Sequence, residues 1–382
     1  MAFTITRVGY RDFRNMHEFV LEPGPRLTIL VGSNAVGKTN CVEGVQILTA
    51  GASFRHVSPA DLIQRGCERA QLRLYAEGEK RTLDVTYDIF PSKKLLSING
   101  KRRPNTEGRG ILPSILFYPD ELMVVKGGAS ERRELIDSFG VQLNAAYAKI
   151  ASDYKRAMIQ RNSLLKDAAR TGLPLDKGMF DAWTESLVSA GSMLYLYRTA
   201  LLARLAPHVA AAYAGLAGGE EASMTYQTSY GMEQAKKPLD EMGFALDSEA
   251  PSRSEVEERL RARLAEVYGD EVRRCQTLAG PHLDDVVLSI GGLPARNFGS
   301  QGQQRTLVLA IKLAQVSLVH EMKGQYPVFL LDDVMSELDS GRRARLFDLV
   351  QGGMQTIVTT TNLEYFRPEE LDEAKVVHLG AL

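Results

Sequence analysis

A glycine-rich segment near the N-terminus carries residues that could bind phosphate. GSNAVGKT, from Gly32 to Thr39, fits the pattern G-x-x-x-x-G-K-T and stands between the apolar run RLTILV and the helix-like run NCVEGVQILTA. In that setting the backbone N–H groups wrap phosphates, and the helix N-terminus adds its positive dipole end. Lys38 would reach the β- and γ-phosphates, and the Thr39 hydroxyl would ligate Mg²⁺. We therefore expect ATP to contact Gly32, Ser33, Asn34, Ala35, Val36, Gly37, Lys38, Thr39 and Asn40.

Two adjacent carboxylates could complete this nucleotide site. A phosphate loop needs a carboxylate on a neighbouring strand, and VFLLDDV places Asp332 directly after four apolar residues. Asp332 would orient Mg²⁺ directly or through water, so Thr39 and Asp332 are the expected metal ligands. Asp333 follows outside the strand, where its carboxylate could polarise an attacking water. The plainer alternative is that one of these two residues caps a helix or a turn.

A second helix N-terminus could also hold an anion. Ser300, Gln301, Gly302 and Gln303 precede the apolar run TLVLAIKLA and would present backbone N–H groups and a hydroxyl. One phosphate loop does not easily enclose a γ-phosphate, but a second copy of the chain could close this segment over the nucleotide. ATP would then hold two subunits together, and hydrolysis would release them. The alternative is an ordinary N-capped helix.

The elements that must position these residues fall into three blocks. Residues 1–125 resemble a series of strands and include Asn99-Gly100, a strong signal for a two-residue hairpin turn. Residues 126–271 are mostly helical, and their apolar stripe favours the core of a helical subdomain over a long coiled coil. A helix in this block is expected to begin at Ser254, with Glu257 completing a capping box. Residues 272–382 alternate between strand and helix, which is typical of a largely parallel sheet.

Several motifs together resemble those of the ABC-type ATPases. The segment from Ser300 to Gln303 resembles their signature loop, and SELD, from Ser336 to Asp339, resembles their D-loop. The place of the insertion resembles the SMC/Rad50-like branch, whose arms emerge there. Within this branch, bacterial replication and repair ATPases have motifs similar to GKTN, ASFR (52–55), YPDELMVVKGGASERRELID (118–137), AGPHLDD (279–285), SQGQQRTLVLAIKLA (300–314), LLDDVMSELD (330–339) and VTTT (358–361).

The resemblance implies a fold and an activity. The fold is an α/β, ABC-type P-loop ATPase head with an antiparallel β subdomain (lobe I, residues 1–125 and 272–382) and an inserted, mostly helical arm (lobe II, residues 126–271). The activity is ATP-driven homodimerisation on DNA in recombinational gap repair. The implied partners are double-stranded and gapped or single-stranded DNA, and the RecR and RecO proteins, which would help to load the RecA recombinase. Roles in replication and in the SOS response are also implied.

Three departures from the usual pattern qualify the resemblance. Ala35 stands where the family usually has Gly, which the general motif permits and which we expect to cost little. Leu283 stands where an Arg is usual, which weakens any role assigned to that position. Thr360 and Thr361 stand where many ABC ATPases have a switch His. Their presence favours a weak ATPase that uses hydrolysis as a switch.

Three other classes of protein were weighed. A transporter ATPase subunit is disfavoured by the long helical insertion before residue 300. A nuclease-coupled Rad50-like protein usually needs longer arms and a zinc hook, whereas a Rad50-like or other SMC-type ATPase that acts as an ATP-gated DNA clamp stays open. A DNA-binding module that does not hydrolyse ATP also stays open, and Asp333 is the residue that distinguishes it.

Charge gives only local evidence for nucleic acid. The net charge of the 382 residues is −1, but the segment from Lys80 to Arg109 has eight Lys or Arg against three Asp or Glu. Such a cluster could neutralise DNA phosphates or be a solvated hairpin tip, and the sequence favours neither. Arg132 and Arg133 could contact DNA, although pairing with Glu131 and Glu134 is slightly favoured. His282 could lie near the nucleotide or cap a turn.

The remaining composition is that of a soluble globular protein. Hydrophobic residues make up 44% of the chain, and we expect no transmembrane helix because no run of about 18 apolar residues was found. The cysteines are three, an odd number without ligand-like spacing, which argues against a disulfide framework. A reducing cytoplasm is the expected location.

Overall fold

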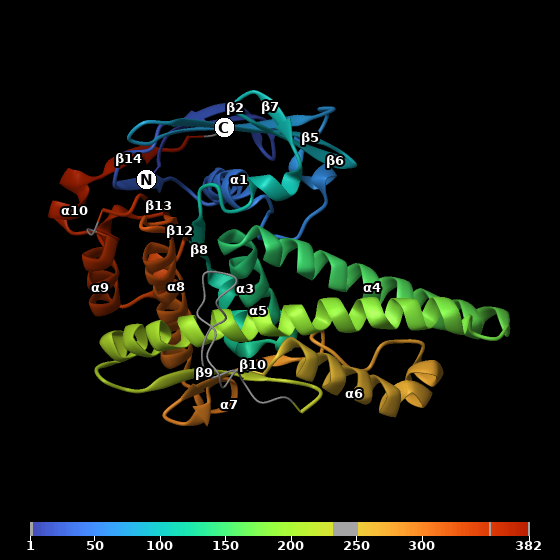
Figure 1. The fold of residues 1–382 in the computed structure, drawn as a ribbon. Coiled ribbons are helices and arrows are strands. Elements are labelled where there is room, and N and C mark those ends of the chain that lie inside the picture. The colour runs from blue at the N-terminus through green and yellow to red at the C-terminus, as the bar shows by residue number, and fades with distance from the viewer. Residues whose placement is uncertain (1–2, 232–250, 351–352, 381–382) are drawn as a thin grey trace. The chain divides into compact units, whose positions relative to one another are not determined.

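The structure is a computed structural model that describes residues 3–231, 251–350 and 353–380. The chain folds into two compact units (Figure 1). Unit 1 combines the two chain ends, Met1–Glu121 and Lys312–Leu382, and unit 2 is the continuous segment Leu122–Ile311. The first boundary lies close to the expected residue 125. The second lies after the expected residue 271, because the strands that follow residue 284 pair within unit 2.

A five-stranded parallel sheet forms the base of unit 1. Its strand order is β14-β3-β13-β12-β8, and every neighbouring pair is parallel. Every residue of the inner strands is buried, as expected for a parallel sheet covered on both faces. The strands are β3 (Leu27–Val31), β8 (Ser114–Phe117), β12 (Val328–Asp332), β13 (Thr356–Thr360) and β14 (Lys375–His378).

A six-stranded antiparallel sheet forms the second layer of unit 1. Its order is β2-β1-β4-β5-β6-β7, built from β1 (Thr4–Phe13), β2 (Met16–Leu21), β4 (Ala70–Glu77), β5 (Thr82–Phe90), β6 (Lys93–Ile98) and β7 (Lys101–Arg103). The predicted hairpin turn is confirmed, because Asn99 and Gly100 join β6 to β7 with φ of 49° and 76°. Positive φ at both positions is what a type I′ turn requires.

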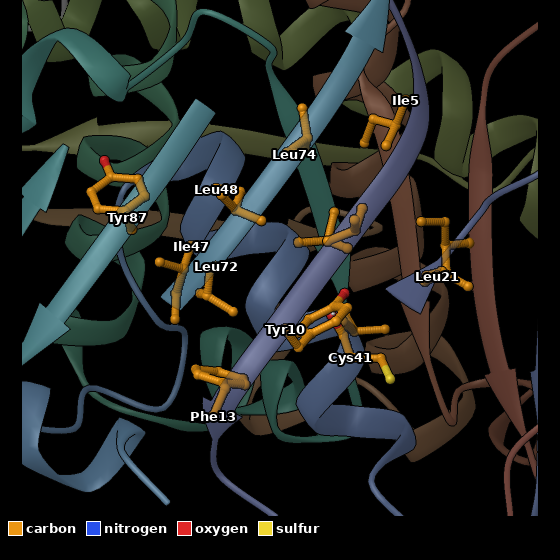
Figure 2. Packing of buried hydrophobic residues seen from close by; sticks show 14 of the residues in the cluster. Ile5, Tyr10, Phe13, Leu21, Cys41, Ile47, Leu48, Leu72, Leu74 and Tyr87 are labelled. Atoms are coloured by element: carbon orange, nitrogen blue, oxygen red, sulfur yellow. Dashed lines mark hydrogen bonds between the residues drawn. The ribbon is translucent and has the colours of Figure 1, made fainter. Parts of the chain in front are cut away.

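Helix α1 (Lys38–Ala50) lies between these two sheets and contacts strands of both. Figure 2 shows the core on its antiparallel side, where Tyr10, Leu72 and Leu74 meet Cys41, Ile47 and Leu48 of the helix. A Cβ on Gly44 would overlap the Tyr10 ring, so the helix approaches β1 as closely as a glycine allows. The Tyr10 hydroxyl donates to the Cys41 carbonyl at 2.9 Å. This packing fixes the position of the residues at the N-terminus of α1.

Three more helices of unit 1 lie in its C-terminal half. They are the second part of α8 (Gln301–Lys323), α9 (Ser340–Val350) and α10 (Pro368–Glu373). The chain passes between the units twice, after Glu121 and within α8 after Ile311. Glu121 and Lys312, the unit 1 residues at these two passages, form a buried ion pair.

Unit 2 is mostly helical and also contains a small antiparallel sheet, β11-β10-β9. Its long helices α4 and α5 run side by side, as Figure 1 shows, and α6 packs on α5. The elements are α2 (Met123–Lys126), α3 (Ala129–Leu143), α4 (Ala145–Thr171), α5 (Lys177–Ala217), β9 (Ala222–Gln227), α6 (Arg253–Arg274), β10 (Asp285–Ile290), β11 (Leu293–Pro294), α7 (Ala295–Phe298) and the first part of α8.

Two local predictions in unit 2 need correction. The helical stripe after residue 130 is two helices, since Asn144 ends α3 and its side chain caps the N-terminus of α4. The capping box of α6 is formed by Ser252 and Glu255 instead of Ser254 and Glu257. Both Ser residues have a Glu three positions later, but Ser252 follows Pro251, and its extended backbone makes it the N-cap.

Helix α5 is long and apolar enough to cross a membrane by length and composition alone, which the sequence analysis did not anticipate. The core helix of a soluble protein meets the same criterion, and α5 packs against α3, α4, α6 and β9. Buried along it are polar side chains that bond within unit 2, such as Arg198 with Asp137.

Candidate functional site

The glycine-rich loop, residues 32–39, joins β3 to α1 as the sequence predicts. Gly37 is the N-cap of α1 with φ of 114°, a conformation that favours glycine. A Cβ on Gly32 would lie 2.8 Å from the Leu379 carbonyl oxygen and 3.0 Å from Val36 Cγ1, so this position also needs glycine. No side chain caps the N-terminus of α1, so no side-chain oxygen competes with a bound anion for the first N–H groups of the helix. The arrangement is that of an anion-binding helix terminus.

Ala35 adopts a left-handed backbone conformation, with φ of 64°. An alanine in this region is strained by roughly 1–2 kcal/mol because its Cβ crowds the neighbouring carbonyl. The preference for glycine here therefore has a conformational cause. The general motif permits Ala35, but the left-handed backbone at this position gives the alanine a conformational cost that a glycine would not have.

Lys38 is buried, and its ammonium group lies against the loop. Nζ donates to the carbonyl oxygens of Gly32 at 2.7 Å and Ser33 at 2.8 Å. Burial lowers the pKa of Lys38, and the carboxylates of Asp333 and Asp332 partly offset that fall. A cation held against loop carbonyls is placed to exchange them for the oxygens of a bound phosphate.

Asp332 ends β12 at the same edge of the sheet as the loop. Its Oδ1 accepts hydrogen bonds from Thr39 Oγ1 at 3.1 Å and Thr359 Oγ1 at 2.7 Å. Burial raises the pKa of Asp332, and the two threonine hydroxyls oppose the rise. A hydroxyl and a carboxylate are oxygen ligands of the kind that Mg²⁺ prefers, so Thr39 and Asp332 suit a magnesium ion bound beside a nucleotide.

Asp333 lies just beyond the strand, as the sequence predicts. Its φ is 52°, a left-handed conformation that Asp tolerates better than most residues. The backbone N–H donates to Thr359 Oγ1 at 2.9 Å, so the same threonine hydroxyl contacts both aspartates. The side chain is half-buried. Non-glycine residues with positive φ are concentrated at functional sites, and the charge of this one acts on Lys38 of the loop.

A network around α1 was not predicted. Glu43 is fully buried and accepts from Arg14 Nη2 at 2.7 Å, from Ser53 Oγ at 2.6 Å and from Arg55 Nη1 at 3.3 Å. Arg55 Nη1 also donates to Asn40 Oδ1 at 2.8 Å. The positive charge of Arg55 lies near enough to Asp332 to oppose the rise in that group's pKa. Ser53 and Arg55 of this network belong to the ASFR segment, but the sequence alone does not show that they contact Glu43 of α1.

Asn15 connects this network to the loop. Asn15 Nδ2 donates to the Val36 carbonyl at 3.2 Å, and Asn40 Nδ2 donates to Asn15 Oδ1 at 2.7 Å. Asn40, one of the expected nucleotide contacts, is therefore used in supporting the loop. The turn between β1 and β2, which contains Asn15, therefore supports the glycine-rich loop through the hydrogen bond to Val36.

The signature-like loop, residues 300–303, lies in unit 2 at the start of α8. The predicted helix start is confirmed, since Ser300 Oγ accepts from Gln303 N at 3.2 Å and Gln303 Oε1 accepts from Ser300 N at 2.8 Å. This reciprocal pair is a capping box. Ser300 and Gln301 are exposed, while Gly302 and Gln303 are half-buried. The hydrogen of the Ser300 hydroxyl and the first backbone N–H groups of α8 are thus available to an anion.

The AGPHLDD segment belongs to the interior of unit 2. His282 Nδ1 lies 2.7 Å from Tyr154 Oη and Nε2 lies 3.1 Å from the Thr277 carbonyl oxygen. Burial lowers the pKa of His282. The histidine therefore joins α4 to the segment before β10. Leu283 is exposed.

Arg132 and Arg133 pair differently from the prediction. Arg132 Nε and Nη2 bond the Asp285 carboxylate at 2.7 and 2.8 Å, and Arg133 Nη1 donates to the Asp284 carbonyl at 2.6 Å. Both arginines thus tie α3 to the start of β10 instead of pairing with their helix neighbours. They are structural residues of unit 2.

The basic segment after Lys80 is partly neutralised within unit 1. Arg102 pairs with Asp88 at 3.1 Å, and Lys94 donates to the Gly51 carbonyl at 2.8 Å. Lys93 and Lys101 are exposed. The outer face of the antiparallel sheet adds Arg7 and Arg11 of β1, which are exposed and form no ion pair among the described residues.

Comparisons with known proteins match this architecture. The family model described as RecF/RecN/SMC N terminal domain matches residues 4–377. The chain is 37% identical to the DNA replication and repair protein RecF of Gloeobacter violaceus, over 97% of this chain and 95% of that protein. It is 35% identical to RecF of Lactobacillus delbrueckii subsp. bulgaricus, over 99% of this chain and 96% of that protein.

Solved structures agree. A structure described as the recombination mediator protein RecF-ATPrS in the RecFOR pathway is similar, with a TM-score of 0.85 and 26% identity over 96% of this chain and 94% of that chain. An Smc head domain from Pyrococcus furiosus matches in fold alone, with a TM-score of 0.53 and 16% identity over 98% and 93% of the two chains. The predicted fold, an ABC-type head with an antiparallel sheet and a helical insertion, is confirmed. The chain therefore belongs to the RecF family of DNA replication and repair proteins, within the ABC-type ATPases of the SMC branch.

Proposed function

We propose that this protein is a weak, Mg²⁺-dependent ATPase that binds DNA as an ATP-driven homodimer. The observation that carries the proposal is the hydrogen bond of Thr39 to Asp332, which brings the phosphate loop and a strand-end carboxylate into one site. Bound ATP would be held by residues 32–40, with Lys38 at its terminal phosphates. A bound Mg²⁺ would be held by Thr39 and Asp332 and would neutralise the phosphate charge.

Asp333 is the proposed catalytic carboxylate. It stands next to the metal ligand and is more exposed, so its oxygens can accept a proton from an attacking water. Thr360 ends β13 and Thr361 follows it, and the absence of a histidine at these positions supports slow turnover. A slow ATPase suits a switch that stays closed for as long as ATP is intact.

The signature-like loop is proposed to complete the site of a second copy. Its capping box leaves the Ser300 O–H and the first N–H groups of α8 free to bind the γ-phosphate held by the partner. The signature-like loop belongs to unit 2 and the phosphate loop belongs to unit 1, so each loop is formed within a single unit. ATP would then be the contact that joins two heads.

DNA is proposed to lie on the outer face of the antiparallel sheet, which we define as the side chains facing away from α1. One row across the strands is Gly9, Arg73, Thr86, Ser97 and Arg102, paired in register. Arg7 and Arg11 flank Gly9 on the same face of β1. Arg73 and Arg102 already pair with Asp84 and Asp88, so Arg7 and Arg11 are the arginines of this face best suited to contact phosphates without reading sequence.

The RecR and RecO proteins are the proposed partners, in recombinational repair of gapped DNA and the loading of RecA. Support comes from the similarity to a RecF structure described as part of the RecFOR pathway. Roles in replication and in the SOS response, and a cytoplasmic location, are part of the same proposal.

Sedimentation velocity with Mg²⁺ and ATP tests the proposal. The wild type should dimerise, Lys38→Met should stay monomeric because it loses ATP, and Ser300→Arg should bind ATP yet stay monomeric. A wild type that stays monomeric with ATP, or a Ser300→Arg dimer equal to wild type, would refute two-subunit closure. For the DNA surface, Arg7→Ala/Arg11→Ala should weaken DNA binding and reduce its salt dependence, whereas Arg263→Ala on α6 should not.

A further inference from the structure

Gln303 of the signature-like loop is bonded to a residue outside the loop. Its Nε2 donates to Glu220 Oε1 at 2.6 Å. The other oxygen of the same carboxylate, Oε2, accepts from the Tyr213 hydroxyl at 2.8 Å. Tyr213 is fully buried on α5, the longest helix of the arm. The end of α5 is therefore connected to the loop by two hydrogen bonds through one carboxylate.

The Gln303 amide is used at both of its ends. Oε1 accepts from Ser300 N to close the capping box, and Nε2 is held by Glu220. A carboxylate acceptor makes the second bond charge-assisted and therefore stronger than one between neutral groups. Because an amide is planar, fixing Nε2 also fixes the direction of Oε1. The cap geometry of Ser300 thus depends on Glu220.

The chain conformation around Glu220 is also specific. Gly218 caps α5 with φ of 72°, and Gly219 follows with φ of 99°. Two consecutive left-handed residues turn the chain sharply after the helix, and β9 begins at Ala222. Glu220 is half-buried in this turn. The turn therefore holds the carboxylate between the last turns of α5 and the loop.

We propose that Glu220 is a positioning residue, which sets the signature-like loop in the geometry that binds the partner subunit's nucleotide and connects that geometry to the arm helix α5. The proposal rests on the proposed function, since it names the residue that prepares the loop for closure. Glu220 does not touch the nucleotide in this role. It acts through Gln303, so that the Ser300 hydroxyl and the first N–H groups of α8 point in a fixed direction before the second copy arrives.

The first test needs no nucleotide. Amide hydrogen exchange of residues 298–306 should be faster in Glu220→Ala than in wild type, because the cap loses its support. Glu220→Gln should exchange like wild type, since its amide can accept from Gln303 and donate to Tyr213. Arg261→Ala is the control: it breaks an exposed ion pair with Glu185 elsewhere on α5 and should leave the loop unchanged. Equal exchange in Glu220→Ala and wild type would overturn the proposal.

The second test measures the ATP concentration for half-maximal dimerisation in sedimentation velocity. Glu220→Ala should need about tenfold more ATP, with the monomer's ATP affinity unchanged, because the phosphate loop is untouched. Tyr213→Phe should show a smaller shift of the same sign, and Glu220→Gln should match wild type. A Glu220→Gln variant as impaired as Glu220→Ala would overturn the proposal that Glu220 acts through its hydrogen bonds to Gln303 and Tyr213. A wild type that dimerises while Glu220→Ala does so equally would refute this inference alone and leave the proposed function intact.

Discussion

The Thr39 hydroxyl donates to the Asp332 carboxylate across 293 positions of sequence. Thr39 lies in the first turn of α1, and Asp332 ends β12, so the bond joins the phosphate loop to the edge of the parallel sheet. Thr359 on β13 donates to the same oxygen. Three elements therefore converge on one carboxylate, and the two hydroxyls keep it aimed at the loop.

Changing Asp332 to Asn tests this site. The amide oxygen can still accept from both threonines, so the thermal midpoint should change little. The loss of negative charge should raise the Mg²⁺ concentration for half-maximal ATP hydrolysis about 10- to 100-fold. Thr39→Ser, which keeps the hydroxyl, is the matched control and should retain activity. An Asp332→Asn variant with wild-type Mg²⁺ dependence would remove Asp332 from the metal site.

Changing Asp333 to Asn tests the catalytic role. Asn also tolerates the left-handed backbone found here, so the variant should fold normally. ATP turnover should fall about 10²- to 10⁴-fold, while ATP binding and dimerisation persist. The expected signature is an ATP-bound dimer with a longer lifetime, measured by sedimentation after excess nucleotide is removed. If turnover is unchanged, the attacking water is activated by another group.

Ala35→Gly should stabilise the protein. The residue has φ of 64°, and glycine would relieve the strain while adding some freedom to the unfolded chain. The net gain in unfolding free energy should be about 0.5–1 kcal/mol, measured by urea denaturation. Ser33→Gly is the control in the same loop, because Ser33 does not have positive φ, and that change should destabilise instead. Destabilisation by Ala35→Gly would contradict the strain argument.

The buried pair Glu121 and Lys312 predicts a pH dependence of stability. Burial raises the pKa of Glu121 to about 7, and the ammonium of Lys312 opposes the rise. Since the folded pKa lies above the unfolded one, the folded state binds more protons between these values, and this contribution to stability is lost as pH rises through about 7.

The measurement is the unfolding free energy between pH 5 and 8. Wild type should lose up to about 1.4 kcal/mol per pH unit below about pH 7 relative to Glu121→Gln, which cannot titrate, and the loss should level off above that pH. Glu121→Gln leaves Lys312 buried without its charge partner, so only the slope with pH is compared. Parallel pH profiles for the two proteins would show that Glu121 is ionised throughout.

The sequence predicted those parts of the site that depend on local patterns. The phosphate loop, the strand before Asp332 and the turn at Asn99-Gly100 are each encoded by adjacent residues, and all three have the expected backbone. The start of α8 at Ser300 was predicted for the same reason. The fold class was predicted from motifs spread along the whole chain, and the similarity to solved RecF structures confirms it.

The errors arise where the partner is distant or where two local signals compete. Arg132 pairs with Asp285, 153 positions away, and nothing near Arg132 indicates that partner. Ser252 and Ser254 both satisfy the capping pattern, so the sequence could not select between them. The compact unit extends beyond residue 271 because β10 pairs with β9 of the insertion, and the sequence of β10 does not indicate which sheet the strand joins.

The order of strands in the parallel sheet has a consequence for synthesis on the ribosome. Strand β3 leads directly into the phosphate loop, yet both of its neighbours, β13 and β14, are made from the last residues of the chain. A nascent chain cannot complete this sheet until residue 378 has been made, whereas residues 122–311 are all available earlier. A message cut short before residue 356 would leave β3 without neighbours and would yield a protein with no nucleotide site. Incomplete products therefore could not join the proposed ATP-bound dimer.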